Sequence, residues 1–358
     1  MAAAAAGKLP DLSGTYKWEK LPELPTGRVY AVGGYHDGKL YVLGGCDGVG
    51  KALSVAEVYS FATKTWHQLP NMPTRRAACT TVIFHENKLI LVGGVDENQT
   101  PIAAVDCFNI DSETWSQLPP LPVGVTGPFV TKIDNKIYCI GGTDKKGINQ
   151  SVSFDFDLNE WKDMPPLKTR RYACGGYVHN NKIYIVGGRE VKEPIKSTEV
   201  FDLETQEWTE LASMLSLRVF YNVMGHKDFI YVVGGFVPMV GLSKIVERYD
   251  IKKNEWERLK DLRVPQSDGS IGVVGDRVVF AAGLGIVAGA KPQDGPSCLN
   301  YAYGLTDGSD TFERLPNMRS KRASTATALF DDKMAVICGA GQGGPQKIVE
   351  ILSCNKEK

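Results

Sequence analysis

The stretch KLYVLGG (residues 39–45) decides the fold, because it returns along the whole chain. Near copies lie at residues 88–94, 136–142 and 182–188, and weaker copies end at Gly235, Gly283 and Gly339. The final glycine recurs at intervals of 46 to 56 residues. A regular period of this length is typical of repeat architectures and predicts seven similar units.

A column of aromatic residues keeps the same rhythm: Trp18, Trp66, Trp115, Trp161, Trp208, Trp256 and Phe312. Each unit carries four short β-like runs separated by turn signals, as in RRYACGGYV, KIYIVGG, STEVFDL and EWTEL of the fourth unit. Such units are typical of propeller blades, which cannot bury both faces alone and pack against neighbours. We therefore predict an all-β, seven-bladed propeller over residues 15–354.

The two columns are out of phase at the chain ends. Trp18 precedes the first double glycine, whereas the last unit ends at KIVEILSC (347–354) without an aromatic residue. We expect the run GTYKWEKL (14–21) to supply the outer strand of the last blade and so to close the ring. Residues 1–14 are expected to form a disordered N-terminal tail, and residues 355–358 a short C-terminal tail.

These motifs resemble kelch repeats: the double glycine, the Trp about 20 residues later and the run LPNMPTRR (69–76) that follows it. The resemblance covers residues 15–354. Together with VLGGCDG (42–48) and GGVDENQTPIAAV (93–105), it is similar to the kelch-only animal proteins of the kelch domain-containing eight subfamily. The sixth and seventh units depart from the pattern at Ala282, Phe312 and Cys338.

Composition excludes several classes of function. Forty-one basic residues balance 41 acidic ones, so no global field favours nucleic acid or an anionic membrane. No apolar run approaches the roughly 20 residues of a membrane helix. The eight cysteines show no metal-ligand spacing and are typical of buried thiols in an intracellular protein. We expect a cytoplasmic, monomeric propeller without metal or cofactor.

A basic column and an acidic column occupy the same five units. Arginine stands at the expected start of the inner strand at Arg28, Arg76, Arg171, Arg218 and Arg322, with Val125 and Gln266 in the other two units. Nine residues before each aromatic position, or at the matching place of the last unit, stand Glu57, Asp106, Val152, Glu199, Glu247, Tyr303 and Glu350. We interpret the columns as structural ion pairs within each blade. An anion-binding ring of arginines is the alternative.

The rim formed by the loops after the double glycines and by the links between blades is called the top face. In kelch proteins that bind peptides, such positions line the binding surface, and the resemblance implies the same use here. The candidate partner-binding residues are Tyr30, Tyr172, Arg189, Phe220, Phe236, Asp96 and Asp144. A peptide anchored by an aromatic or acidic residue would suit this surface. Aromatic residues that merely plug the channel mouth are the other interpretation.

The sixth unit is longest because of GLGIVAGAKPQDGPSCLN (283–300). We expect this loop on the top face. It is either a partner-contacting segment or a tolerated surface insertion.

The patterns favour a binding module over an enzyme. Four of the five histidines fall at the turns of the opposite rim, and no nucleophile-elbow, phosphate-loop or zinc-protease motif is present. We predict a non-enzymatic adaptor or scaffold that binds a protein or peptide, with no catalytic residue. Two alternatives remain open: a mutarotase-like enzyme acting on a sugar, and the substrate-binding part of a ubiquitin-ligase complex assembled in trans, since no BTB or BACK helices are recognisable.

Overall fold

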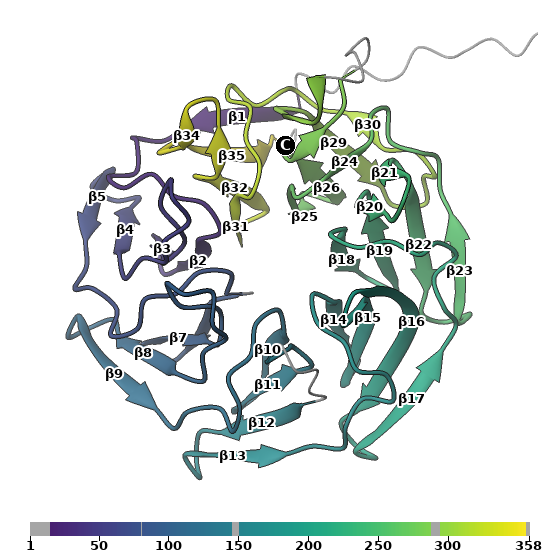
Figure 1. The fold of residues 1–358 in the computed structure, drawn as a ribbon. Coiled ribbons are helices and arrows are strands. Elements are labelled where there is room, and N and C mark those ends of the chain that lie inside the picture. Colours follow the sequence, from purple (N-terminus) through teal and green to yellow (C-terminus); the bar gives the residue numbers. More distant parts are fainter. Residues whose placement is uncertain (1–14, 80, 145–149, 288–293, 356–358) are drawn as a thin grey trace, which may run out of the picture.

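The computed structural model describes residues 15–79, 81–144, 150–287 and 294–355. Over these residues the strands form seven four-stranded antiparallel sheets, set around a central axis like blades (Figure 1). We number the blades 1 to 7 in the order of their inner strands. This part of the chain contains no α-helix. The tail expected at residues 1–14 lies outside the described residues, as do residues 356–358.

Each blade is a meander of four strands, which follow one another in order from the central axis to the outer rim. The inner strands are β2 (Val32–His36), β6 (Ile83–His85), β10 (Phe129–Ile133), β14 (Gly175–His179), β18 (Asn222–His226), β25 (Ser270–Val274) and β31 (Ala326–Phe330). The second strands are β3 (Lys39–Leu43), β7 (Lys88–Val92), β11 (Lys136–Ile140), β15 (Lys182–Glu190), β19 (Phe229–Val233), β26 (Arg277–Ala281) and β32 (Lys333–Ile337). The third strands are β4 (Ala56–Ser60), β8 (Val105–Asn109), β12 (Ser151–Asp155), β16 (Glu193–Asp202), β22 (Val246–Asp250), β29 (Ala302–Thr306) and β35 (Val349–Cys354). The outer strands are β5 (Thr65–Gln68), β9 (Thr114–Leu118), β13 (Glu160–Asp163), β17 (Glu207–Leu211), β23 (Glu255–Arg258), β30 (Glu313–Arg314) and β1 (Tyr16–Lys20).

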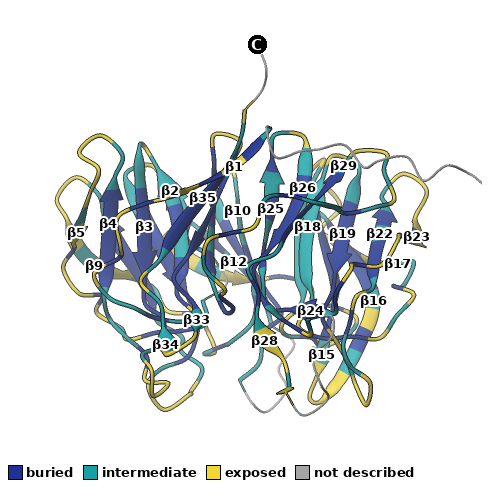
Figure 2. Ribbon diagram, turned by 90° about the horizontal axis from the view of Figure 1, so that it is seen from above, coloured by how far each residue is buried: buried dark blue, intermediate teal, exposed yellow. Residues whose placement is uncertain are grey.

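The second strands are apolar on both faces because a blade packs against a neighbour on each side. In β7, the four residues after Lys88 are all buried, so a continuous apolar run replaces the alternation of a one-sided sheet. The outer strand β5 is exposed at three of its four positions, and only Trp66 is partly buried. Burial therefore falls from the blade interior to the rim (Figure 2).

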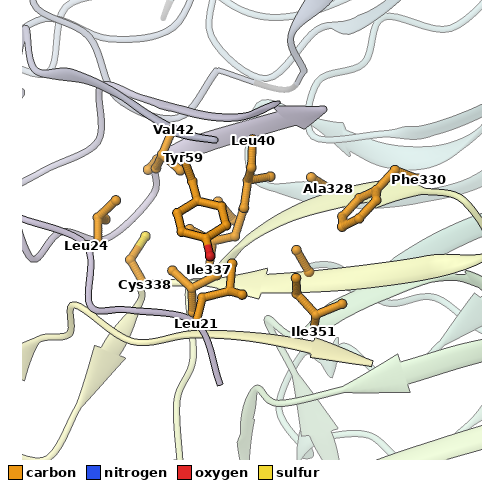
Figure 3. Packing of buried hydrophobic residues seen from close by; sticks show 14 residues of the cluster. Leu21, Leu24, Leu40, Val42, Tyr59, Ala328, Phe330, Ile337, Cys338 and Ile351 are labelled. Carbon is orange, nitrogen blue, oxygen red and sulfur yellow. The ribbon is translucent and has the colours of Figure 1, made fainter. Parts of the chain in front are cut away.

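The N-terminal strand completes blade 7. Strand β1 pairs antiparallel with β35, with Trp18 opposite Leu352. The indole N–H of Trp18 donates to the carbonyl of Pro316, 2.8 Å away, in the link from blade 6. Blade 7 then packs on blade 1: Tyr59 lies among Leu21, Ile337 and other buried apolar residues from both blades (Figure 3). The chain ends therefore share one sheet.

The double glycine marks a close approach between neighbouring blades. A Cβ added to Gly44 would lie 2.4 Å from the carbonyl oxygen of Arg76 in the next blade, which is too close for any side chain. Gly45 has φ +98° and donates its N–H to the same carbonyl at 2.9 Å. Glycine is thus required here by the inter-blade contact and by the positive φ.

Short extra ladders extend the sheets at the top face. They are β20 (Phe236–Val237) with β21 (Gly241–Leu242), β24 (Gln266–Ser267) with β27 (Leu284–Gly285) and β28 (Ser297–Cys298), and β33 (Ala340–Gly341) with β34 (Gly344–Pro345). In blade 4, β15 and β16 continue into a hairpin beyond a register shift between Val186 and Gly188. The top face points down in Figure 2, where this hairpin, β28 and β34 lie.

Candidate functional site

Five arginines of the top rim are fully buried, and each lies against a carboxylate from the third strand of its own blade. The distances from guanidinium nitrogen to carboxylate oxygen are 2.8 Å for Arg28–Glu57, 2.8 Å for Arg76–Asp106, 2.5 Å for Arg171–Glu199, 3.2 Å for Arg218–Glu247 and 2.9 Å for Arg322–Glu350. All ten side chains are at most 1% exposed. Burial lowers the pKa of Arg28, Arg218 and Arg322, and the charge of the facing carboxylate offsets part of that effect.

The pairs also bind backbone groups that no strand satisfies. In blade 4, Arg171 donates to the carbonyls of Gly187 and Ser197, both at 2.9 Å. Glu199 accepts the backbone N–H groups of residues 168 and 169 at 2.8 and 3.0 Å, in the link from blade 3. In blade 4 the pair therefore connects the second strand, the third strand and the incoming link. We propose that these ten residues are structural and leave no guanidinium of this column free for a ligand.

The top rim carries a ring of residues in the left-handed conformation, one per blade. Its members, with φ between 49° and 64°, are Tyr30, Ala78, Gly127, Ala173, Phe220, Asp268 and Ser324. Backbone hydrogen bonds join neighbours in the ring: Tyr30 N–H donates to Ser324, and Ser324 N–H donates to Asp268, both at 3.2 Å. A bulky side chain is costly at such a φ. The aromatic residues Tyr30 and Phe220 are therefore unfavourable choices for the backbone alone.

A pocket of about 550 Å³ opens on this face between blades 5 and 6. It is lined by Tyr30, Phe220, Tyr221, Asn222, Phe236, Leu242, Ser267, Asp268, Leu284 and Pro296. Tyr30 comes from blade 1 and also lines a second cavity of about 250 Å³ at the axis. The structure thus brings three of the candidate residues, Tyr30, Phe220 and Phe236, into one concave site whose walls are mostly apolar.

Two more candidate residues adjoin this pocket. The guanidinium of Arg189 lies 5.4 Å from the ring centroid of Phe220 and 5.8 Å from that of Tyr172. The Tyr172 hydroxyl donates to the carbonyl of Val191 at 2.7 Å, in the blade 4 hairpin. These contacts fix a cation between two aromatic rings beside the pocket.

The acidic candidates lie elsewhere on the rim. Asp96 accepts the backbone N–H groups of Asn98 and Thr100, both at 2.8 Å, and so holds its own turn in blade 2. Asp47 makes the same contacts in blade 1, with Val49 and Lys51. Asp144 belongs to the corresponding loop of blade 3, of which residues 145–149 are not described. Neither Asp96 nor Asp144 lines the pocket between blades 5 and 6.

Asp268 is the residue that sequence reasoning missed as a site residue. It occupies the same ring position as Tyr30 and Phe220, and that shared position was the available signal. Asn222 and Tyr221 follow Phe220 directly along the chain, but they enter the pocket only because the inner strand β18 begins there. The long loop of blade 6 contributes Leu284 and Pro296, while its residues 288–293 lie outside the described part.

The family model of the KLHDC2/KLHL20/DRC7 kelch-repeats domain matches residues 11–142 and 120–283. The chain belongs to this kelch-repeat family. This match confirms the predicted kelch repeats. The solved structure of YjhT aligns with 94% of this chain and 99% of the YjhT chain, with a TM-score of 0.56 at 16% sequence identity. The predicted all-β propeller architecture is confirmed by this likeness.

Curated kelch relatives match over short segments. An F-box/kelch-repeat protein of Arabidopsis thaliana is 36% identical over 66 residues, 18% of this chain and 16% of the relative. Kelch domain-containing protein 8B of Bos taurus is 42% identical over 50 residues, 14% of each chain. This chain therefore aligns with less than a fifth of the length of either relative. Kelch domain-containing protein 8B belongs to the subfamily whose sequence motifs this chain resembles.

Several chemical features bear on function. Over the described residues, no cluster of three histidine, cysteine or acidic side chains has the arrangement of a metal site. All eight cysteines are free thiols, and burial raises the pKa of Cys139 to about 12 and of Cys174 to about 11. In the described ranges, no helix is long and apolar enough to cross a membrane.

Proposed function

We propose that this kelch propeller is a non-enzymatic interaction module that binds a partner protein through the top face of blades 1, 4, 5 and 6. Exposed apolar side chains around one pocket carry the proposal. Phe220 is 55% exposed, Tyr30 50% and Phe236 39%, and the adjoining turn exposes Met239 completely. Contiguous apolar surface of this kind, centred on aromatic residues, is typical of protein-binding sites.

The charges of the rim support the same proposal. The five arginines that could attract an anionic substrate are buried in pairs, and Arg189 is held against aromatic rings. A surface with aromatic anchors and one accessible guanidinium suits a folded or extended protein segment. The free thiols support a cytoplasmic location. We further propose that the propeller is monomeric and acts as an adaptor or scaffold.

Proximity labelling tests the proposal with a variant that carries Tyr30→Ala, Arg189→Ala and Phe236→Ala. We expect this variant to keep its fold and to lose a defined set of the proteins labelled by the wild type. The matched control carries Leu158→Ala and Leu329→Ala, which remove exposed side chains (55% and 43%) away from the top face. Retention of the full set by the triple variant would contradict the proposal.

A further inference from the structure

The pocket between blades 5 and 6 is lined mostly by apolar side chains. Tyr30, Phe220 and Phe236 supply aromatic rings, while Leu242 and Leu284 supply aliphatic groups. The two aromatic residues in the left-handed conformation, Tyr30 and Phe220, both line this one pocket. Their backbone cost at the same site indicates that the aromatic surface itself is used.

Asp268 is the charged residue among the ten that line the pocket. Its Oδ2 accepts the hydroxyl of Ser324 at 2.5 Å, and the structure shows no basic side chain within ion-pair distance over the described residues. Burial raises the pKa of this carboxyl. A carboxylate in such surroundings is stabilised by an added cation, because the pairing offsets the loss of water.

Asn222 adds a second unmatched acceptor. Its side-chain N–H group donates to the carbonyl of Gly269 at 2.7 Å, and this bond sets the orientation of the amide. The buried Oδ1 then has no hydrogen-bond partner among the described residues. Because this oxygen is itself buried, the acceptor that the pocket offers to a ligand is the carboxylate of Asp268, and the ligand must bring the donors.

We propose that this pocket binds a basic side chain, arginine or lysine, from a segment of the partner protein. The proposal rests on the proposed function and names the chemistry of its anchor. A guanidinium or ammonium group supplies several donors and the missing positive charge, and its apolar stem suits the aromatic walls. The contact of Arg189 with Phe220 already shows a guanidinium on this aromatic surface. An acidic anchor would instead meet the charge of Asp268.

The test uses four small probes: the N-acetyl methylamides of arginine, lysine, citrulline and glutamate, titrated into the full chain and followed by ligand-observed NMR. We expect arginine and lysine to bind, with affinities on the order of millimolar for ligands of this size. Citrulline, the neutral analogue of arginine, should bind about tenfold to a hundredfold more weakly, the range of one charge-assisted hydrogen bond. Equal binding of arginine and citrulline, preference for glutamate, or no binding of arginine would overturn the proposal.

Asp268→Asn removes the charge and keeps the shape. This variant should lose arginine binding by about tenfold to a hundredfold and should no longer distinguish arginine from citrulline. The matched control is Asp47→Asn, which makes the same change on the same face at a carboxylate held by its own turn. The control should bind arginine as the wild type does. An Asp268→Asn variant with unchanged arginine affinity would overturn the proposal.

A basic residue of the chain itself is the competing occupant. Lys291 lies in the part of the blade 6 loop that is not described. If Lys291 neutralised Asp268, Asp268→Asn and Lys291→Gln would lower the melting temperature equally, and that result would overturn the partner proposal. We expect neither variant to lower it. The two experiments distinguish this inference from the proposed function. If the triple variant lost labelled proteins while Asp268→Asn bound the arginine probe as the wild type does, the proposed function would be supported and this inference would be wrong.

Discussion

Replacing Arg76 by valine tests whether the buried arginine column is structural. Arg76 lies 2.8 Å from Asp106, and both side chains are at most 1% exposed. The same guanidinium donates to the carbonyls of Leu91, Gly93 and Ala104 at 3.0 to 3.3 Å. The substitution leaves a buried carboxylate without its cation, which costs about 3–5 kcal/mol.

For a domain of this size the unfolding entropy is about 0.7 kcal/mol/K, so the loss corresponds to a melting temperature lowered by about 4–7 °C. Blade 3 supplies the matched comparison, because Val125 and Val152 stand where blade 2 has Arg76 and Asp106, and both are buried. The double variant Arg76→Val, Asp106→Val should therefore recover most of the loss. Differential scanning calorimetry of Arg76→Val, of Asp106→Val and of the double variant gives the coupling energy of the pair. A single variant with the wild-type melting temperature, or additive losses in the double variant, would refute the structural interpretation.

Three further predictions concern other parts of the propeller. Deleting residues 1–20 removes β1 and the buried Trp18, so the melting temperature should fall by more than about 7 °C in a thermal scan. An unchanged melting temperature would contradict closure of the ring through β1. Gln266 is fully buried, and neither the nitrogen nor the oxygen of its side-chain amide has a hydrogen-bond partner among the described residues. Gln266→Met should therefore raise the melting temperature by about 1–4 °C. A decrease would show that the amide is hydrogen-bonded in solution. The pKa of Asp268 is raised in the folded protein, so folding stability is lost as the pH rises through that pKa. The variant Asp268→Asn should therefore melt at a higher temperature than the wild type at neutral pH, and the two melting temperatures should converge in acid. A difference in melting temperature that does not depend on pH would contradict this prediction.

The repeating pattern was enough to predict the blades because it is a local property of the chain. A double glycine after four apolar residues indicates a strand buried on both faces, and Trp18 ahead of the first repeat indicates how the last sheet is completed. The spacing from Arg76 to Asp106 likewise placed two charges at the same height of one blade. The reason for the glycines was less accessible. Their main constraint is the carbonyl oxygen of the next blade, which lies 2.4 Å from the Cβ that Gly44 lacks.

The pocket depended on the tertiary structure. Its residues come from blades 1, 5 and 6, and Tyr30 reaches it across the channel mouth, about 190 residues before Phe220 along the chain. The sequence by itself determined which residues are buried in strands and which charges pair within a blade, because each repeat carries that information locally. Only closure of the ring decided which top-face side chains meet, because contacts between distant blades depend on how all seven sheets pack around the axis.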